Sequence, residues 1–134
     1  LKAMQQAVQE IADARQAWQQ NWETRAVELA AAIAQRIIRR QLDRTPEITL
    51  DWVREALELA AGGGEVVLRL NPQDHTSLGD RVNRIAQEMS RLGAVRIVAD
   101  PAISAGGCRV ETQFGSIDQQ VEAQLARITE ELLG

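Results

Sequence analysis

Reactive side chains gather in one short segment near the end of the chain, residues 106–118. The segment carries a thiol, two carboxylates and two hydroxyls, on Cys108, Glu111, Asp118, Thr112 and Ser116. A thiol beside a base can act as a nucleophile, and two carboxylates can work as a general acid and a general base. Each of these interpretations requires partner groups from the rest of the chain.

The thiol has no obvious partner. Cys108 is the only cysteine, and the only histidine, His75, is distant in the sequence. The alternation of residue types predicts that Cys108 points inward beside Val110, as an inert buried thiol. A single cysteine also excludes an internal disulfide, which fits a reducing compartment. We expect His75 at the surface, with too few potential ligands around it for a metal site.

The carboxylates have structural interpretations as well. Glu111 is expected on the solvent face of a strand, and Asp118 in the first turn of the last helix, where it complements the helix dipole. Ser116 and Gln119 have the spacing of a capping box. No phosphate-binding motif of the GxxxxGK[ST] or GxGxxG type occurs, and the glycines at 62–64 precede a strand rather than a helix. We therefore predict no enzyme activity and no cofactor.

Length and charge limit the remaining classes of protein. The chain has 134 residues and a formal net charge of −4. That length suffices for one domain with its own core. The negative charge argues against general affinity for nucleic acid or an acidic membrane surface. No apolar run approaches the ~20 residues that span a bilayer. Because the first residue is leucine, we expect a piece of a longer protein.

The first 43 residues contain no glycine and no proline, which favours one long helix. Apolar residues recur with spacings of three and four, interrupted by Arg15 and Arg25. This pattern predicts a coiled-coil stalk that pairs two copies. The alternative is a long helix folded back onto its own domain. The expected dimer seam consists of Leu1, Met4, Val8, Ile11, Trp18 and Trp22.

After Leu29 the apolar set of this helix becomes wider. It includes Ile33, Ile37, Ile38 and Leu42. A wide apolar stripe is typical of a helix that faces a globular core. We therefore expect the stalk to run into the body of the protein at this point, and we divide the chain into a stalk at 1–43 and a globular domain at 44–134.

The rest of the chain alternates helical and strand patterns. We expect a helix at 49–61 capped by Thr49, and a strand at 65–70. Asn71 should be the N-cap and Pro72 the first residue of a short turn or helix, and a helix at 78–92 should follow, buried through Val82, Ile85, Met89 and Leu92. A strand at 95–99 and a strand from 107 follow, the latter with Cys108, Val110, Thr112 and Phe114 inward. The last helix is expected at 117–133, buried through Ile117, Val121, Leu125, Ile128 and Leu132.

This order, α-α-β-α-β-β-α, predicts an α+β fold. The β–α–β unit should be parallel and right-handed. The next connection is too short for a crossover, so the third strand should run antiparallel to the second. The expected result is a small mixed three-stranded sheet with its helices packed mainly on one face.

Arginines mark the outward face of this predicted sheet. Arg69, Arg96 and Arg109 occupy one position on each strand, and Glu111 lies on the same side as Arg109. Two interpretations stay open for these residues. They form an ordinary solvated face, or they form a surface that binds a partner protein, since arginine is enriched at interfaces.

Three segments resemble the FliH family, which includes flagellar export stator proteins and their injectisome relatives of the SctL (HrpE/YscL) type. The similarity lies in the C-terminal run at 106–118 and in two earlier segments, at 69–74 and 95–101, in the same order and spacing. It covers residues 50–134 well. The N-terminal part is similar only in its general helical character.

The resemblance implies a dimeric cytoplasmic protein, peripheral to the inner-membrane export apparatus, that binds the N-terminal region of the export ATPase. It implies a stator and regulator without catalytic residues, related to the peripheral stalks of rotary ATPases. In flagellar members a longer N-terminal region contacts the C-ring, and we expect that region to be missing here. The alternatives are an injectisome stator of the same family or an E-type peripheral-stalk subunit.

Overall fold

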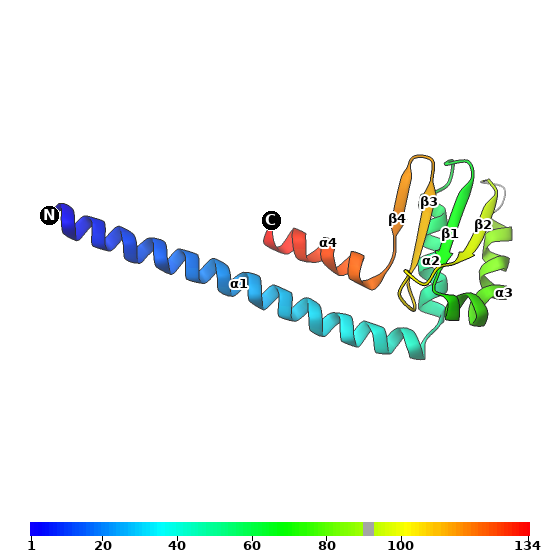
Figure 1. Cartoon of the computed structure of the whole chain (residues 1–134), viewed down its shortest axis with the longest axis horizontal. Coiled ribbons are helices and arrows are strands. Elements are labelled where there is room, and N and C mark those ends of the chain that lie inside the picture. Colours follow the sequence, from blue (N-terminus) through cyan, green and yellow to red (C-terminus); the bar gives the residue numbers. More distant parts are fainter. Residues whose placement is uncertain (90–92) are drawn as a thin grey trace.

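The computed structural model describes residues 1–89 and 93–134. Within these residues an extended helix joins a small body made of a sheet and helices (Figure 1). None of the helices in the described ranges combines the length and apolar character that crossing a membrane requires. The elements in chain order are α1 (Lys2–Arg44), α2 (Glu47–Leu59), β1 (Val66–Leu70), α3 (Pro72–Glu88), β2 (Val95–Ala99), β3 (Cys108–Thr112), β4 (Gly115–Asp118) and α4 (Val121–Leu133).

The predicted long N-terminal helix is confirmed. α1 runs without interruption to Arg44, and the chain leaves the helix at Thr45, before Pro46. Proline disfavours helical geometry in the residue before it, which explains the end point. The first half of α1 projects away from every other element (Figure 1), and every residue from 1 to 23 is exposed.

The predicted α+β class is confirmed, with one strand more than expected. The described sheet has the order β2-β1-β3-β4. β1 and β2 are parallel and α3 connects them, as predicted. β3 runs opposite to β2, also as predicted, but it pairs with β1 on the other side. The prediction of three strands is wrong, because β4 adds a fourth strand antiparallel to β3.

The fourth strand replaces the predicted start of the last helix. Gly115 has a φ of +145°, which glycine adopts easily, and the chain turns back there. Ile117 then pairs with Val110 across the β3–β4 ladder. The predicted capping box of Ser116 and Gln119 is therefore wrong, and α4 begins only at Val121. The strand ladder provides the backbone hydrogen bonds that the first helical turn was expected to make.

Two other helix boundaries differ from the prediction. α2 begins at Glu47 rather than near 49, so Thr49 lies inside the helix and is buried instead of capping it. Pro46 occupies the cap position, where its lack of an N–H has no cost. Val53, in the middle of this helix, is fully buried.

α3 begins earlier than predicted. The side chain of Asn71 accepts a hydrogen bond from the backbone N–H of Gln73 at 2.9 Å, and Pro72 is the first helical residue. The predicted cap is confirmed, and of the two alternatives it starts a helix, which is continuous with the helix expected from 78. The described part of α3 ends at Glu88. Leu92, which we expected to be buried, lies outside the described residues.

The main core lies between the sheet and the pair α2 and α3. Side chains of β1 and β3 that point toward these helices are buried, those of β2 are partly buried, and helix side chains meet them from the other side. The expected one-sided covering of the sheet is present (Figure 1). β2 is an edge strand of the sheet, and Ala99 at its end is exposed. The largest fully buried side chains of this core are Leu68, Leu70, Val53, Val82, Val110 and Cys108.

A second cluster joins α4 to α1. Leu42, Val121 and Leu125 are buried there. An ion pair between Arg39 and Glu122 links the same two helices. α4 thus packs on α1 rather than over the sheet (Figure 1). The side of α4 that faces α1 carries Leu125 and Thr129. Ile128 and Leu132 lie off that side, so their predicted burial is wrong: Ile128 is 50% exposed and Leu132 is 69% exposed.

Candidate functional site

The thiol of Cys108 is part of the main core. It lies at the start of β3 and has no solvent exposure, as predicted. Burial, and after it the carboxylates of Asp118 and Glu55, raise the pKa of this thiol to about 12. Such a thiol stays protonated at neutral pH and is a poor nucleophile. His75, the only possible base of its type, lies partly buried in α3.

The two carboxylates of residues 106–118 form hydrogen bonds with other parts of the fold. An oxygen of Glu111 accepts a hydrogen bond from Arg69 Nε at 3.0 Å. Asp118 lies in β4 rather than in the first turn of α4, and its Oδ1 accepts from the backbone N–H of Gln120 at 2.9 Å. Within residues 1–89 and 93–134, no group of three or more His, Cys, Asp and Glu side chains is arranged to hold a metal ion.

The predicted partner surface is here called the arginine face: Arg69, Arg96, Arg109 and Glu111. The strand register places all four on the side of the sheet opposite to Leu68 and Val110, which point into the core. Arg69 lies directly opposite Arg109 across the β1–β3 ladder. Two like charges in that position repel each other.

Acidic neighbours neutralise most of the arginine face. Glu111 lies 3.0 Å from Arg69 Nε and 3.6 Å from Arg109 Nε, and so relieves the repulsion between the two guanidinium groups. The other end of Arg69 is 3.3 Å from Asp100. Arg96 is exposed and forms no ion pair with the described part of the chain. The face therefore carries one unengaged cation rather than three.

A continuous apolar face runs along α1. The six residues of the predicted seam, Leu1, Met4, Val8, Ile11, Trp18 and Trp22, are between 60% and 98% exposed. Leu29, Ile33 and Ile37 are exposed as well. At ~100° per residue, all nine side chains fall within roughly a third of the helix circumference. We call these nine residues the stalk face.

The stalk face corrects the prediction for the end of α1. We expected Ile33, Ile37, Ile38 and Leu42 to form one wide stripe toward the core. The structure instead divides them between two sides of the helix. Ile38 and Leu42 pack toward α4, and Ile33 and Ile37 point the other way. A contiguous exposed apolar surface of this length is typical of a protein–protein interface.

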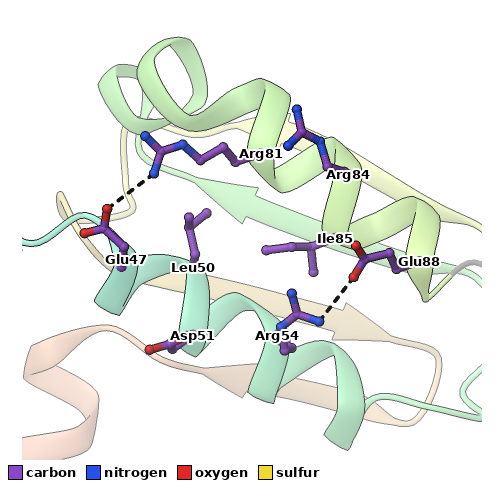
Figure 2. A pocket seen from close by; sticks show the side chains of 8 residues that line it. All are labelled: Glu47, Leu50, Asp51, Arg54, Arg81, Arg84, Ile85 and Glu88. Atoms are coloured by element: carbon purple, nitrogen blue, oxygen red, sulfur yellow. Dashed lines mark hydrogen bonds and ion pairs between the residues drawn. The ribbon is translucent and has the colours of Figure 1, made fainter.

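A groove between α2 and α3 has a different character (Figure 2). It encloses about 270 Å³, and Leu50 lies between ion pairs at its two ends. Glu47 is 3.6 Å from Arg81, and Arg54 is 3.3 Å from Glu88. These side chains are about half exposed, so each pair contributes at most ~1 kcal/mol. The pairs connect the two helices, and the balanced charge gives the groove no preference for an ion.

Sequence reasoning missed an apolar patch at the far end of the sheet. Phe114 was expected to point inward, but it is 79% exposed in the turn between β3 and β4. Leu59, at the end of α2, is 66% exposed. Leu59 and Phe114 both line a second groove, which is distinct from the groove between α2 and α3. The signal that could have revealed the turn is the glycine at 115 followed by a short polar–apolar alternation, which is typical of a hairpin.

The structure defines the class of the protein as a long helix with an exposed apolar face joined to a small α+β body. Comparison with known sequences is consistent with that class. The chain belongs to the family of flagellar assembly protein FliH, whose pattern it matches over residues 1–128. This match confirms the resemblance seen in the three segments.

Individual relatives come from both flagellar and secretion systems. A type 3 secretion system stator protein of Yersinia enterocolitica is 29% identical over 62% of this chain and 37% of its own length. Flagellar assembly protein FliH of Borreliella burgdorferi is 31% identical over 78% of this chain and 34% of its own length. A probable flagellar assembly protein FliH of Bacillus subtilis is 26% identical over 80% of this chain and 51% of its own length. The chain thus spans between a third and a half of these curated relatives.

Proposed function

We propose that this chain is the stalk and docking domain of a non-enzymatic stator that regulates a flagellar type III export ATPase. Two copies pair through the stalk, and the α+β domain binds the N-terminal region of the ATPase. The pair works in the cytoplasm, peripheral to the inner-membrane export apparatus. Membership of the FliH family supports the system, and the stator named among the relatives supports the mechanical role.

The stalk face is the observation that carries the pairing. Nine large apolar side chains, two of them tryptophans, are exposed along α1. Burying Trp18 and Trp22 alone would remove a large apolar area from water, at about 25 cal/mol per Å². The face extends to Ile37, beside the part of α1 that packs on α4. A second copy of α1 can therefore lie against the first along almost its whole length without displacing α4.

Light scattering after size exclusion tests the pairing. The unaltered chain is expected to be a dimer, and the double variant Trp18→Glu with Trp22→Glu a monomer, because four buried charges would have to be accommodated in the seam. The matched control is Gln16→Glu with Gln20→Glu. These residues have the same spacing but lie on the opposite side of α1. A clean monomer from the unaltered chain at micromolar concentration would remove the premise.

Co-purification tests the docking. The chain should retain the cognate export ATPase, and it should not retain an ATPase without its N-terminal segment. The two outcomes separate the pairing from the docking, because a dimer that fails to bind the ATPase keeps the first half of the proposal and rejects the second.

An injectisome stator is the second candidate, because a secretion stator and a flagellar protein match the chain at nearly the same identity. The genes beside this one distinguish the two systems. An E-type peripheral-stalk subunit would instead need a coiled-coil partner of different sequence. A homodimer in the light-scattering experiment would argue against that alternative.

A further inference from the structure

Two arginines interrupt the stalk face. Arg15 and Arg25 continue the spacing of three and four with which apolar side chains recur along α1, and they flank the two tryptophans of the seam. At ~100° per residue, Arg15 falls in the middle of the stalk face and Arg25 at its edge. Both side chains are exposed in the single chain. When a second copy covers this face, these charges leave water, which destabilises the pair unless each cation finds a partner.

The chain itself gives these arginines no acidic partner. The residues one helical turn from Arg15 on either side carry no carboxylate; they are Ile11, Ala12, Trp18 and Gln19. Glu28 lies one turn after Arg25, but neither Arg15 nor Arg25 forms an ion pair within residues 1–89 and 93–134. Both guanidinium groups are therefore free to engage a second copy.

The stalk face matches itself when two copies run in the same direction and in register. Each apolar side chain then lies opposite its own counterpart, as the a and d residues of a parallel coiled coil do. In an antiparallel pair centred on the tryptophans, Leu1 would instead lie opposite Arg39, which already forms an ion pair with Glu122. Met4 would lie opposite Arg36. The parallel arrangement is therefore the one that buries the whole face.

Heptad geometry identifies the side chains that surround each arginine in a parallel pair. A seam residue of a coiled coil inserts between four residues of the facing helix. For Arg15 these are, on the second copy, Ile11, Ala14, Arg15 and Trp18. For Arg25 they are, on the second copy, Trp22, Arg25, Ala26 and Leu29. Neither set contains a carboxylate, and each set contains one tryptophan.

The indole rings are suited to receive the guanidinium groups, because a planar guanidinium stacks on aromatic faces and tryptophan is the strongest partner of this kind. Side chains of an α-helix also lean toward its N-terminus. The ring of Trp18 thus leans over the layer that contains Arg15. For the same reason, Arg25 leans toward the layer that contains Trp22. Each arginine therefore has an aromatic ring within reach on the second copy.

The register of the pair decides how many arginines reach a ring. In register, the two arginines of each copy all face a tryptophan of the other copy. With one copy shifted by a heptad, Arg15 of that copy would lie among the apolar side chains of Met4, Ala7, Val8 and Ile11. Arg25 of the other copy would lie beside Leu29, Ala32, Ile33 and Arg36. Half of the cations would then be buried without a partner, which destabilises the shifted pair.

We propose that the two arginines of the stalk face fix its register by stacking on the indole rings of a second copy of this chain. Arg15 stacks on Trp18 of that copy, and Arg25 stacks on Trp22. A polar residue in a coiled-coil seam specifies register at some loss of stability, and here the rings offset that loss only in the matched position. This inference deepens the proposed function and rests on its pairing of two copies.

Disulfide trapping in the full chain measures the register. Met4→Cys should cross-link to itself, because a disulfide requires Cα atoms within about 7 Å of each other. In a mixture of Met4→Cys and Ile11→Cys chains, a disulfide between the two variants forms only when one copy shifts by a heptad. This shifted product should be at least about tenfold rarer than the self-linked products. It should become several-fold more frequent when Arg15→Met and Arg25→Met remove the cations. Cys108 is buried and takes no part.

A double-mutant cycle tests the stacking itself. Trp18→Leu with Trp22→Leu removes the rings and keeps the seam apolar. With both arginines present, this change should raise the dissociation constant of the dimer about tenfold or more. With Arg15→Met and Arg25→Met, the same change should raise it far less. The matched control is Val8→Ala, on the same face but beyond the reach of either arginine, and it should weaken the dimer by the same factor in both backgrounds.

Two results overturn the inference. The first is a pair of arginine and tryptophan effects on the dissociation constant that simply add. The second is a shifted cross-link that is no more frequent in the methionine variant, when circular dichroism shows that this variant is helical. Both results leave the dimer, and with it the proposed pairing, in place. A monomer from the unaltered chain at micromolar concentration rejects the pairing itself, and this inference with it.

Discussion

At the scale of single residues, the environment of a side chain decides its chemistry. Cys108 could serve as a nucleophile by its type, but it is enclosed by Val110 and the other core residues. Burial, together with Asp118 and Glu55, raises the pKa of the thiol to about 12, above its ordinary value of 9.0. The folded state therefore holds the thiol proton more tightly than the unfolded state does.

This difference predicts a loss of stability in alkali. The stabilisation is fully present below about pH 9 and is lost as the pH rises toward 12. The free energy of unfolding should fall by about 1.4 kcal/mol per pH unit in this window. Urea titrations at several pH values under reducing conditions measure it, and Cys108→Ala is the control, expected to lack this slope. The chain has no tyrosine, so few other side chains titrate in this pH window. Equal slopes in both proteins would contradict the assignment.

Thr49 shows the same dependence on surroundings. It was expected to cap α2, but its hydroxyl is buried and donates a hydrogen bond to the carbonyl of Gly106 at 3.0 Å. Thr49→Val keeps the shape and removes the donor, so the carbonyl is left without that partner. We expect the free energy of unfolding to fall by about 1–3 kcal/mol. Thr76→Val removes a similar but exposed bond to Pro72, and it should have almost no effect, because water replaces the hydroxyl. Equal effects of the two substitutions would show that the buried bond adds nothing.

At the scale of elements, the loop between β2 and β3 contacts both α1 and α3. The backbone N–H of Gly106 donates to Asp74 of α3 at 2.7 Å. Asn71, at the start of the same helix, donates to the carbonyl of Ile103 at 3.0 Å. A Cβ atom on Gly106 would come within 2.7 Å of Leu42 in α1. The loop is thus packed tightly between the two helices.

Two glycine substitutions measure this packing. Gly62 and Gly106 both have a φ of +84°, but a Cβ on Gly62 meets nothing within 4 Å. Gly62→Ala should therefore cost only the backbone strain, about 1–2 kcal/mol. Gly106→Ala should cost more, because Leu42 must also move. Thermal unfolding of the two variants gives the difference. Equal costs would mean that the loop yields easily and does not hold α1 in place.

At the scale of the whole molecule, the two halves of α1 differ in their packing against the rest of the chain. The second half packs on α4 through Leu42, Val121 and Leu125. The first half is exposed on every side. Helical stability in proteins comes mostly from packing of an apolar face. We therefore expect the first half of α1 to depend on a second chain.

We expect the helix content of the chain to depend on its concentration. Dilution below the dissociation constant of the dimer, or the double variant Trp18→Glu with Trp22→Glu, should lower the far-ultraviolet circular dichroism of helix. The loss should match the share of the helical residues that lies in the first half of α1. The Gln16→Glu with Gln20→Glu variant should keep the full signal. A signal independent of concentration in a monomeric chain would show that α1 needs no partner.

Local patterns in the sequence predicted most of the elements. The absence of glycine and proline predicted α1, alternation predicted β1 to β3, and Asn71 with Pro72 predicted a helix start. These properties depend on residues close together in the chain, so they can be read without the fold. The seam positions on α1 and the outward position of Arg69 follow from the same periodicities, and their roles in binding stay predictions.

Only the tertiary structure decided which surfaces are free. β3 pairs with β1 and turns back into β4, and that turn moves Phe114 from the expected core to the solvent. The packing of α4 on α1 assigns Ile38 to a buried contact and leaves Ile37 exposed. Strand pairing and helix packing bring together residues that are distant in the sequence. A local periodicity cannot predict such contacts. The sequence by itself therefore determined the family and the reactive groups of residues 106–118, and the tertiary structure showed that this segment buries its thiol and presents its phenylalanine.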